Sequence, residues 1–317
     1  MNVNSLSPRE LAGRLRGPGI WLQTGPFTIR VRTPIQGLAR SIGQLYADHP
    51  IQDPGLFADF HVSCRVPWGP RRWYKPQVLF FVDDQMPFKP VPLRQVLPFF
   101  EWALNWCIGS RANQYLIIHA ASIERDGRAV IMPAPPTSGK STLCAALVSR
   151  GWRLLSDELA IIRPRDGDLI PLVRPISLKN ESIEVIRRFA PEAELSAPTP
   201  GTNKGTVVHM KPPGPWVRRA GEPARPAWII FPRYRAGAPP TLKPRAKAMT
   251  FLQISENSFN YSLFGAEGFG IMARLIDACD CYGFSYGNLD EAMAVFDQLE
   301  PPAASRAGSV VESRSNA

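Results

Sequence analysis

The stretch PAPPTSGKSTL, residues 133–143, decides the fold class of this 317-residue chain. It matches the phosphate-binding pattern G-x-x-x-x-G-K-[ST] at every defined position except the first, where Ala134 replaces glycine. Gly139, Lys140 and Ser141 fill the remaining defined positions. The pattern is specific only when a strand leads into the loop and a helix leaves it, so the flanking sequence decides the interpretation.

Both flanks of the loop have the required character. The segment YLIIHAASIERDGRAVIMPA, residues 115–134, reads as two apolar strands joined at Asp126-Gly127, a dipeptide that favours a hairpin turn. The loop is followed by KSTLCAALVSRG, residues 140–151, a helix pattern that ends at Gly151. The sequence therefore predicts strand, phosphate-binding loop and helix in that order, which is an α/β arrangement.

The loop has the groups that a nucleotide requires. Backbone N–H groups at a helix start bind phosphate, assisted by the helix dipole, and Pro135 and Pro136, which have no N–H, precede the main donors. Lys140 is expected to neutralise the β- and γ-phosphates of ATP, and the Ser141 hydroxyl to bind Mg²⁺. The predicted nucleotide-binding residues are Thr137, Ser138, Gly139, Lys140, Ser141 and Thr142. The alternative is a Gly-Lys-Ser helix cap without a ligand.

Two acidic residues follow the helix at a distance that returns the chain to the loop. Asp157 and Glu158 end the apolar strand expected within residues 152–158. Carboxylates beside the loop can bind Mg²⁺ or accept a proton from an attacking hydroxyl, so the predicted metal ligands are Ser141, Asp157 and Glu158. The alternative is a strand that ends in solvated acids. His119 lies on the strand before the loop, where a buried core histidine is the competing interpretation.

Composition limits the classes of function. Apolar residues make up 44% of the chain, enough for a large core. The net charge of +10 attracts anions such as nucleotides and acidic peptides, although arginine-rich loops that keep the protein in solution explain it more simply. The sequence has no dense Lys/Arg block and no known nucleic-acid-binding module, so nucleic acid is not an expected partner.

The cysteines and apolar segments indicate the compartment. Five cysteines, an odd number in a long chain, predict reduced thiols and no disulfide framework. The first residues lack the apolar run of a signal peptide, and the most apolar helix candidate, residues 96–110, is too short to span a bilayer and contains Glu101. We therefore expect a cytoplasmic protein that has no membrane partner.

The sequence pattern divides the chain into three parts. Residues 1–110 predict an N-terminal α+β region, residues 111–300 a P-loop catalytic domain, and residues 301–317 a polar, disordered tail. Within the second part, SAPTPGTNKGT, residues 196–206, predicts a flexible loop, and AWIIFPRY, residues 227–234, predicts a strand.

Three segments in this order, HAASI, DGRAVIMPAPPTSGKSTL and GWRLLSDE, resemble the catalytic core of bacterial HPr kinase/phosphorylase. The resemblance is closer to the HPr-kinase-related group called HprK-related kinase A, and it covers about residues 111–298. It implies an α/β fold with a P-loop kinase core of the HPr kinase and PEP carboxykinase type, a mixed sheet with flanking helices. It also implies a kinase that uses ATP and Mg²⁺ to phosphorylate serine.

The same resemblance implies a role for each catalytic residue. Lys140 and Ser141 take the phosphate and metal roles, and Asp157 is the base that activates the acceptor hydroxyl. Glu158 stands where the family has an aspartate and binds metal or positions the substrate. His119 occupies the position of the family histidine, so the expected catalytic residues are Asp157, Lys140 and His119.

These observations favour one function over two alternatives. The favoured function is an ATP-dependent serine kinase, a transferase whose acceptor is a small protein, a peptide or a small molecule. The oligomeric state stays open, and a homo-oligomer is one alternative. The alternatives are a P-loop ATPase or nucleotide-dependent switch without an acceptor, and a non-catalytic nucleotide-binding scaffold. Arg174, Lys179 and Lys204 are weaker candidates for contact with phosphates or acceptor, and ordinary surface charge is the competing interpretation.

Overall fold

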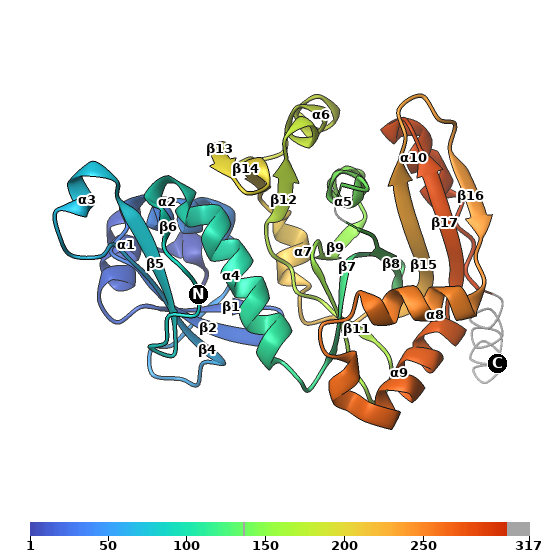
Figure 1. The fold of residues 1–317 in the computed structure, drawn as a ribbon, viewed down its shortest axis with the longest axis horizontal. Coiled ribbons are helices and arrows are strands. Elements are labelled where there is room, and N and C mark those ends of the chain that lie inside the picture. Colours follow the sequence, from blue (N-terminus) through green and yellow to red (C-terminus); the bar gives the residue numbers. More distant parts are fainter. Residues whose placement is uncertain (136, 303–317) are drawn as a thin grey trace. The chain divides into compact units, whose positions relative to one another are not determined.

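The computed structural model describes residues 1–135 and 137–302. The chain forms two compact units, each built from two stretches of sequence (Figure 1). The first unit contains Met1–Arg111 and Leu172–Gly221, and the second contains Ala112–Pro171 and the chain from Glu222 on. The domain division at residues 110 and 300 stays a prediction. The predicted disordered tail lies outside the described residues from residue 303 on.

The first unit contains a six-stranded sheet in the order β3-β1-β2-β4-β5-β6, in which only β2 and β4 are parallel neighbours. Its strands are β1 (Ile20–Thr24), β2 (Phe27–Arg32), β3 (Ile51–Gln52), β4 (Phe60–Arg65), β5 (Gln77–Val82) and β6 (Val91–Pro92). Its helices are α1 (Pro8–Arg16), α2 (Gln36–Leu45), α3 (Arg71–Tyr74) and α4 (Val96–Arg111), with 3₁₀ turns at Val3–Ser5 and Leu93–Gln95. The reciprocal side-chain caps of Ser7 and Glu10 begin α1.

A smaller three-stranded antiparallel sheet, β12-β14-β13, belongs to the same unit. Its elements are β12 (Ile176–Lys179), α6 (Glu181–Phe189), β13 (Thr199–Thr202), β14 (Gly205–Met210) and α7 (Gly214–Arg218). The expectation of a flexible loop at residues 196–206 is wrong, because β13 and β14 form a hairpin there. The Thr202 hydroxyl donates to the Gly205 carbonyl at 2.7 Å and accepts from the Lys204 N–H at 3.1 Å, which closes the turn.

The second unit is built on an eight-stranded mixed sheet in the order β11-β10-β7-β8-β15-β17-β16, with β9 also paired to β7 (Figure 1). Its strands are β7 (Leu116–Arg125), β8 (Arg128–Pro133), β9 (Arg153–Ser156), β10 (Leu159–Ile162), β11 (Leu169–Ile170), β15 (Arg225–Tyr234), β16 (Thr241–Pro244) and β17 (Asp280–Tyr286). The predicted hairpin at Asp126-Gly127 is confirmed, and both residues have positive φ, 53° and 76°. β15 is parallel to β8 and to β17, so these three strands share one direction.

Helices cover both faces of this sheet. The helices are α5 (Lys140–Ser149), α8 (Lys247–Glu256), α9 (Gly265–Asp277) and α10 (Leu289–Asp297), with a 3₁₀ turn at Tyr261–Phe264. Leu116 and Ile118 of β7 share a core with Ile271 and Met272 of α9. Ile117, which points to the opposite face, is equally buried. The unit is therefore α/β, with a mixed sheet and flanking helices. Within residues 1–135 and 137–302, no helix combines the length and apolar character needed to cross a bilayer.

Candidate functional site

Strand register brings the loop and the acids to one edge of the second unit's sheet. β7 is antiparallel to both β8 and β9, so β8 and β9 run in the same direction on either side of it. Ala120 of β7 lies opposite Pro133, the last residue of β8. Ser122 lies opposite Ser156, the last residue of β9. The loop after β8 and the acids after β9 therefore leave the sheet at the same end of its strands. We call this end the loop edge, and it also carries His119.

The turn into α5 depends on a glycine. Gly139 has φ 88°, in the left-handed region, and a Cβ placed there would lie 2.6 Å from the Tyr286 Oη. The Tyr286 hydroxyl donates to the Gly139 carbonyl at 3.1 Å, and the Tyr234 N–H donates to the Ser138 carbonyl at 2.9 Å. The loop is therefore held from β15 and β17, and a side chain at residue 139 would disturb it.

Lys140 is the most informative residue of the loop. It is the first residue of α5, and its side chain is buried. Among residues 1–135 and 137–302, no hydrogen-bond partner reaches its Nζ, and none reaches the buried Oγ of Ser138. A buried ammonium without a hydrogen-bond partner is costly, so this position suits an anionic ligand. The residues therefore fit a nucleotide phosphate.

Cys144 lies one turn after Lys140 on α5, and the pKa of its thiol depends on the charges nearby. Burial raises the pKa of its thiol well above the usual value, the Asp157 carboxylate raises it further, and the Lys140 ammonium lowers it. Both charges therefore act on the same buried thiol. Lys140 and Asp157 are therefore both near the Cys144 side chain.

The acids follow a tight turn. The Ser156 Oγ accepts the N–H of Leu159 at 3.1 Å, which places Asp157 and Glu158 at the corner between β9 and β10. Asp157 is buried, whereas Glu158 is partly exposed and its Oε2 lies 3.1 Å from the Nε2 of His119. The His119 side chain is 32% exposed, so it is not the enclosed core histidine of the competing interpretation.

The predicted metal ligands suit Mg²⁺ that is bound together with phosphates. In the described residues, no group of three or more His, Cys, Asp or Glu side chains could hold a metal ion unaided. Mg²⁺ is commonly held by one or two carboxylates plus substrate phosphates and water, which matches Asp157, Glu158 and the partly exposed Ser141. The donor set therefore fits a metal that arrives with the nucleotide.

The three weaker cationic candidates belong to the first unit. Arg174 is buried and bonded to the Glu101 carboxylate at 2.7 Å and to the Asn105 side chain at 2.6 Å, so a structural ion pair explains its charge. Lys179 ends β12 and Lys204 lies in the β13–β14 turn.

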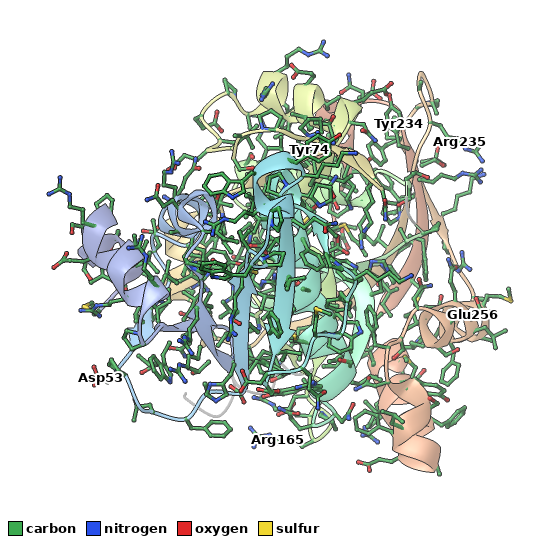
Figure 2. All side chains as sticks on the ribbon, turned by 60° about the vertical axis from the view of Figure 1, so that its left-hand side comes forward. Asp53, Tyr74, Arg165, Tyr234, Arg235 and Glu256 are labelled. Atoms are coloured by element: carbon green, nitrogen blue, oxygen red, sulfur yellow. The ribbon has the colours of Figure 1, made fainter. Side chains whose placement is uncertain are left out.

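Sequence reasoning missed two tyrosines at the loop edge. Tyr234 and Tyr286 are register partners at the ends of parallel β15 and β17, and both contact the loop. Tyr234 is exposed, as is its neighbour Arg235, and Figure 2 shows both side chains at the surface. The signal was present in AWIIFPRY, a strand that ends in an aromatic residue, but its place beside the loop depends on strand order.

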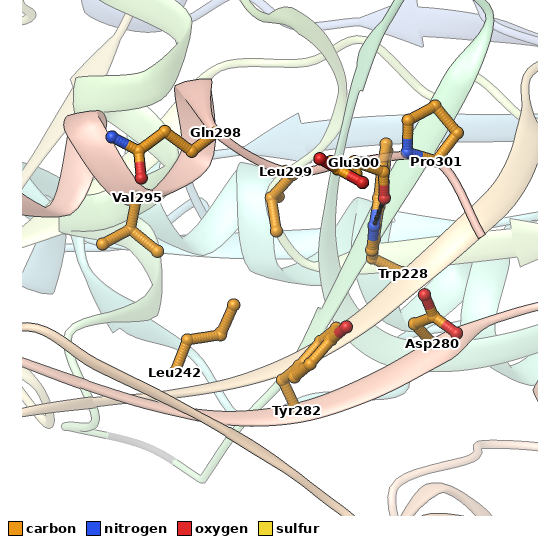
Figure 3. A pocket seen from close by; sticks show the side chains of 9 residues that line it. All are labelled: Trp228, Leu242, Asp280, Tyr282, Val295, Gln298, Leu299, Glu300 and Pro301. Carbon is orange, nitrogen blue, oxygen red and sulfur yellow. Dashed lines mark hydrogen bonds between the residues drawn. The ribbon is translucent and has the colours of Figure 1, made fainter. Parts of the chain in front are cut away.

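A cavity of the second unit lies elsewhere. It measures about 620 Å³, and Trp228, Asp280 and Tyr282 are among the side chains that line it (Figure 3). Trp228 and Asp280 are register partners near the amino ends of β15 and β17, whereas the loop lies at the carboxyl ends. This cavity is therefore separate from the site.

Comparison with models of known protein families finds no match, and comparison with curated proteins finds none either.

Proposed function

We propose that this chain is an ATP-dependent kinase that transfers the γ-phosphoryl group of ATP to a serine hydroxyl. The acceptor is a small protein, a peptide or a small molecule. The observation that carries the proposal is the buried Lys140 Nζ at the start of α5, which has no hydrogen-bond partner among residues 1–135 and 137–302. The resemblance of this loop, its hairpin and the following acids to HPr kinases supports the same reaction.

In this proposal the loop binds the phosphates. Lys140 neutralises charge on the β- and γ-phosphates, and the N–H groups at the start of α5 donate to the phosphate oxygens. The Ser138 N–H points to the Pro135 carbonyl at 3.4 Å, so the donors nearest the helix are the effective ones. Mg²⁺, held by Ser141 with Asp157 or Glu158, supplies further neutralisation of the phosphate charge.

In this proposal Asp157 and Glu158 activate and position the acceptor. Asp157 accepts the proton of the serine hydroxyl while the serine oxygen bonds to the γ-phosphorus and the bond to the β-phosphate oxygen breaks, leaving ADP. Burial of Asp157 excludes water from this carboxylate. Glu158 orients the His119 ring through their 3.1 Å contact, which places a partly exposed imidazole beside the acceptor position.

The decisive experiment combines purified protein, Mg²⁺ and γ-labelled ATP, with and without a cell lysate. Lys140→Ala is the control for the loop and Asp157→Asn the control for the base. We expect label on a serine of a lysate component with the native protein, none with Lys140→Ala, and undiminished ATP binding without transfer for Asp157→Asn. Labelled free phosphate with no labelled acceptor would instead establish the ATPase alternative, and absence of ATP binding would refute both.

A further inference from the structure

The strand that leads into the phosphate-binding loop, β8, has chemically different residues on its two sides. β8 lies between β7 on one side and β15 on the other. The side of β7 carries His119, Asp157 and Glu158 at the loop edge. The side of β15 and β17 carries Tyr234 and Tyr286. We call these the acid flank and the tyrosine flank.

The acid flank fixes the direction of a bound nucleotide. In the proposed function, from which this inference proceeds, the γ-phosphate lies beside the carboxylates and the acceptor. Ligands of open α/β sheets bind across the carboxyl ends of the strands. A nucleoside triphosphate is longer than the loop that holds its phosphates, so its base extends away from the acid flank and over the ends of β15 and β17.

Tyr286 forms the rigid part of the tyrosine flank. It is 1% exposed, its ring stacks on Phe284 with centroids 5.3 Å apart, and its hydroxyl is bonded to the Gly139 carbonyl. Burial raises the pKa of Tyr286, so the hydroxyl stays protonated and remains a donor. The ring of Tyr286 in turn supports Tyr234, whose ring is inclined at 67° to it at a centroid distance of 5.7 Å.

Tyr234 is the exposed part of the tyrosine flank. Its side chain is 52% exposed, although its backbone N–H is bonded to the Ser138 carbonyl of the loop. Its Cβ lies only 3.0 Å from the position that a Cβ of Gly139 would take. An aromatic ring that is fixed at its base, supported on one side and open to solvent is suited to stacking on a planar ligand.

We infer that Tyr234 is the stacking platform for the nucleobase of the bound nucleotide, and that Tyr286 positions both this platform and the loop. The acceptor does not compete for this surface, because its hydroxyl must reach Asp157 on the acid flank. Stacking of a base on an aromatic side chain tolerates any base, so Tyr234 contributes affinity for nucleotides in general.

The test separates the base from the phosphates. Binding of Mg-ATP and of Mg-tripolyphosphate, which has no base, is measured by calorimetry for native protein, Tyr234→Ala and Tyr234→Phe. We expect Tyr234→Ala to weaken ATP binding by about tenfold to a hundredfold and to leave tripolyphosphate binding unchanged. Tyr234→Phe keeps the ring and should bind both ligands as the native protein does. Tyr282→Ala, on β17 at the cavity edge of the sheet, is the matched control and should change neither affinity.

The outcomes distinguish this inference from the proposed function. If Tyr234→Ala weakens both ligands equally, Tyr234 shapes the loop and the inference is overturned. If it changes neither, the base lies elsewhere and the inference is likewise overturned. If the native protein binds tripolyphosphate and ATP with the same affinity, no base subsite exists although the loop still binds phosphate. If the native protein binds neither ligand, the proposed function itself fails.

Discussion

Arg153 and Lys140 are both buried cations of the second unit, yet their surroundings are opposite. The Arg153 guanidinium is bonded to the Glu124 carboxylate and to the Glu222 carbonyl. The Lys140 Nζ has no hydrogen-bond partner in the part of the chain that the structure describes. Arg153 and Glu124 are register partners at the hairpin end of β7, and Lys140 lies at the loop end of the same strands.

The difference shows which buried charge serves the fold and which serves a ligand. A buried cation is tolerated when an anion of the chain compensates it, as for Arg153, and for Arg174 with Glu101 in the first unit. Lys140 has no such bonded anion among residues 1–135 and 137–302, so its Nζ is open to an anionic ligand.

The largest effect is expected where a structural pair is broken. Glu124→Ala leaves Arg153 buried with only the half-exposed Glu222 carboxylate, 3.7 Å away. It also removes the acceptor of the Gly127 N–H, which donates to Glu124 at 2.5 Å. We expect the free energy of unfolding to fall by about 3–5 kcal/mol, measured by urea denaturation. Asp277→Ala, which breaks an exposed pair with Lys247, should cost less than about 1 kcal/mol. Equal losses for the two variants would show that the Glu124–Arg153 pair is not structural.

The reverse pattern is expected at the loop. Lys140→Met removes a buried charge that has no hydrogen-bond partner among the described residues, so the free energy of unfolding should stay the same or rise. Phosphoryl transfer should fall by about 10²–10³-fold, because a preorganised charge on the phosphates is lost. Arg153→Met, measured in parallel, should lower stability. A loss of stability for Lys140→Met as large as that for Arg153→Met would make Lys140 a structural cation.

His49 in the first unit shows a third way to bury an ionisable group, which is to keep it neutral. Burial lowers its pKa to about 4, and its Nε2 lies 2.9 Å from the Val173 carbonyl. The unfolded state binds the proton more readily than the folded state. The stability that depends on a neutral His49 is therefore present above pH 6.5 and is lost as the pH falls towards 4. We expect unfolding at pH 5 to require about 2 kcal/mol less than at pH 7 on account of this group.

His49→Gln isolates this contribution from the other titrating groups. The charges that act on His49 are Glu101 and Asp48, which raise its pKa, and Arg174, which lowers it. All three remain in the variant, so only the contribution of His49 to the pH dependence of the free energy of unfolding is removed. The urea midpoints of the variant should change less between pH 7 and pH 5 than those of the native protein. An unchanged pH dependence would mean that His49 is protonated without penalty in the folded state.

Local signals in the sequence were sufficient for the loop and its neighbours. The Asp126-Gly127 turn, the Gly-Lys-Ser sequence and the glycine after α5 each act over a few residues, and the structure has the expected elements there. Composition misled at residues 196–206, where Pro, Thr and Gly indicated a loop but side-chain hydrogen bonds of Thr202 close a hairpin. The same residue types occur in tight hairpin turns and in unpaired loops. Only the pairing of the flanking residues as strands distinguishes the two.

The rest of the site depends on strand order and on partners distant in sequence. Arg174 and Lys140 were both candidates for phosphate binding, and nothing near Arg174 in the sequence predicts its pairing with Glu101, 73 residues away. Tyr234 and Tyr286 could not be assigned to the loop, because β15 and β17 join β8 only through long connections. The sequence therefore predicted the acid flank and missed the tyrosine flank.

The smallest effect is expected at the turn that joins the two flanks. Gly139→Ala places a residue with a side chain at φ 88°, which costs about 1–2 kcal/mol, and its Cβ meets the Tyr286 hydroxyl at 2.6 Å. We expect a lower free energy of unfolding and a several-fold weaker affinity for ATP, measured by denaturation and calorimetry. Tyr286→Phe in the same chain removes the oxygen, so the double variant should recover the part of the loss that is steric.

Gly127→Ala is the matched control for this substitution, because its φ is 76° and no atom lies within 4 Å of the added Cβ. It should show the conformational cost alone and leave ATP affinity unchanged, since it lies at the hairpin end of the sheet. The difference between the two alanine variants measures how closely Tyr286 encloses the loop. If they lose stability equally, and the Tyr286→Phe substitution recovers nothing, then the tyrosine flank does not hold the loop in place.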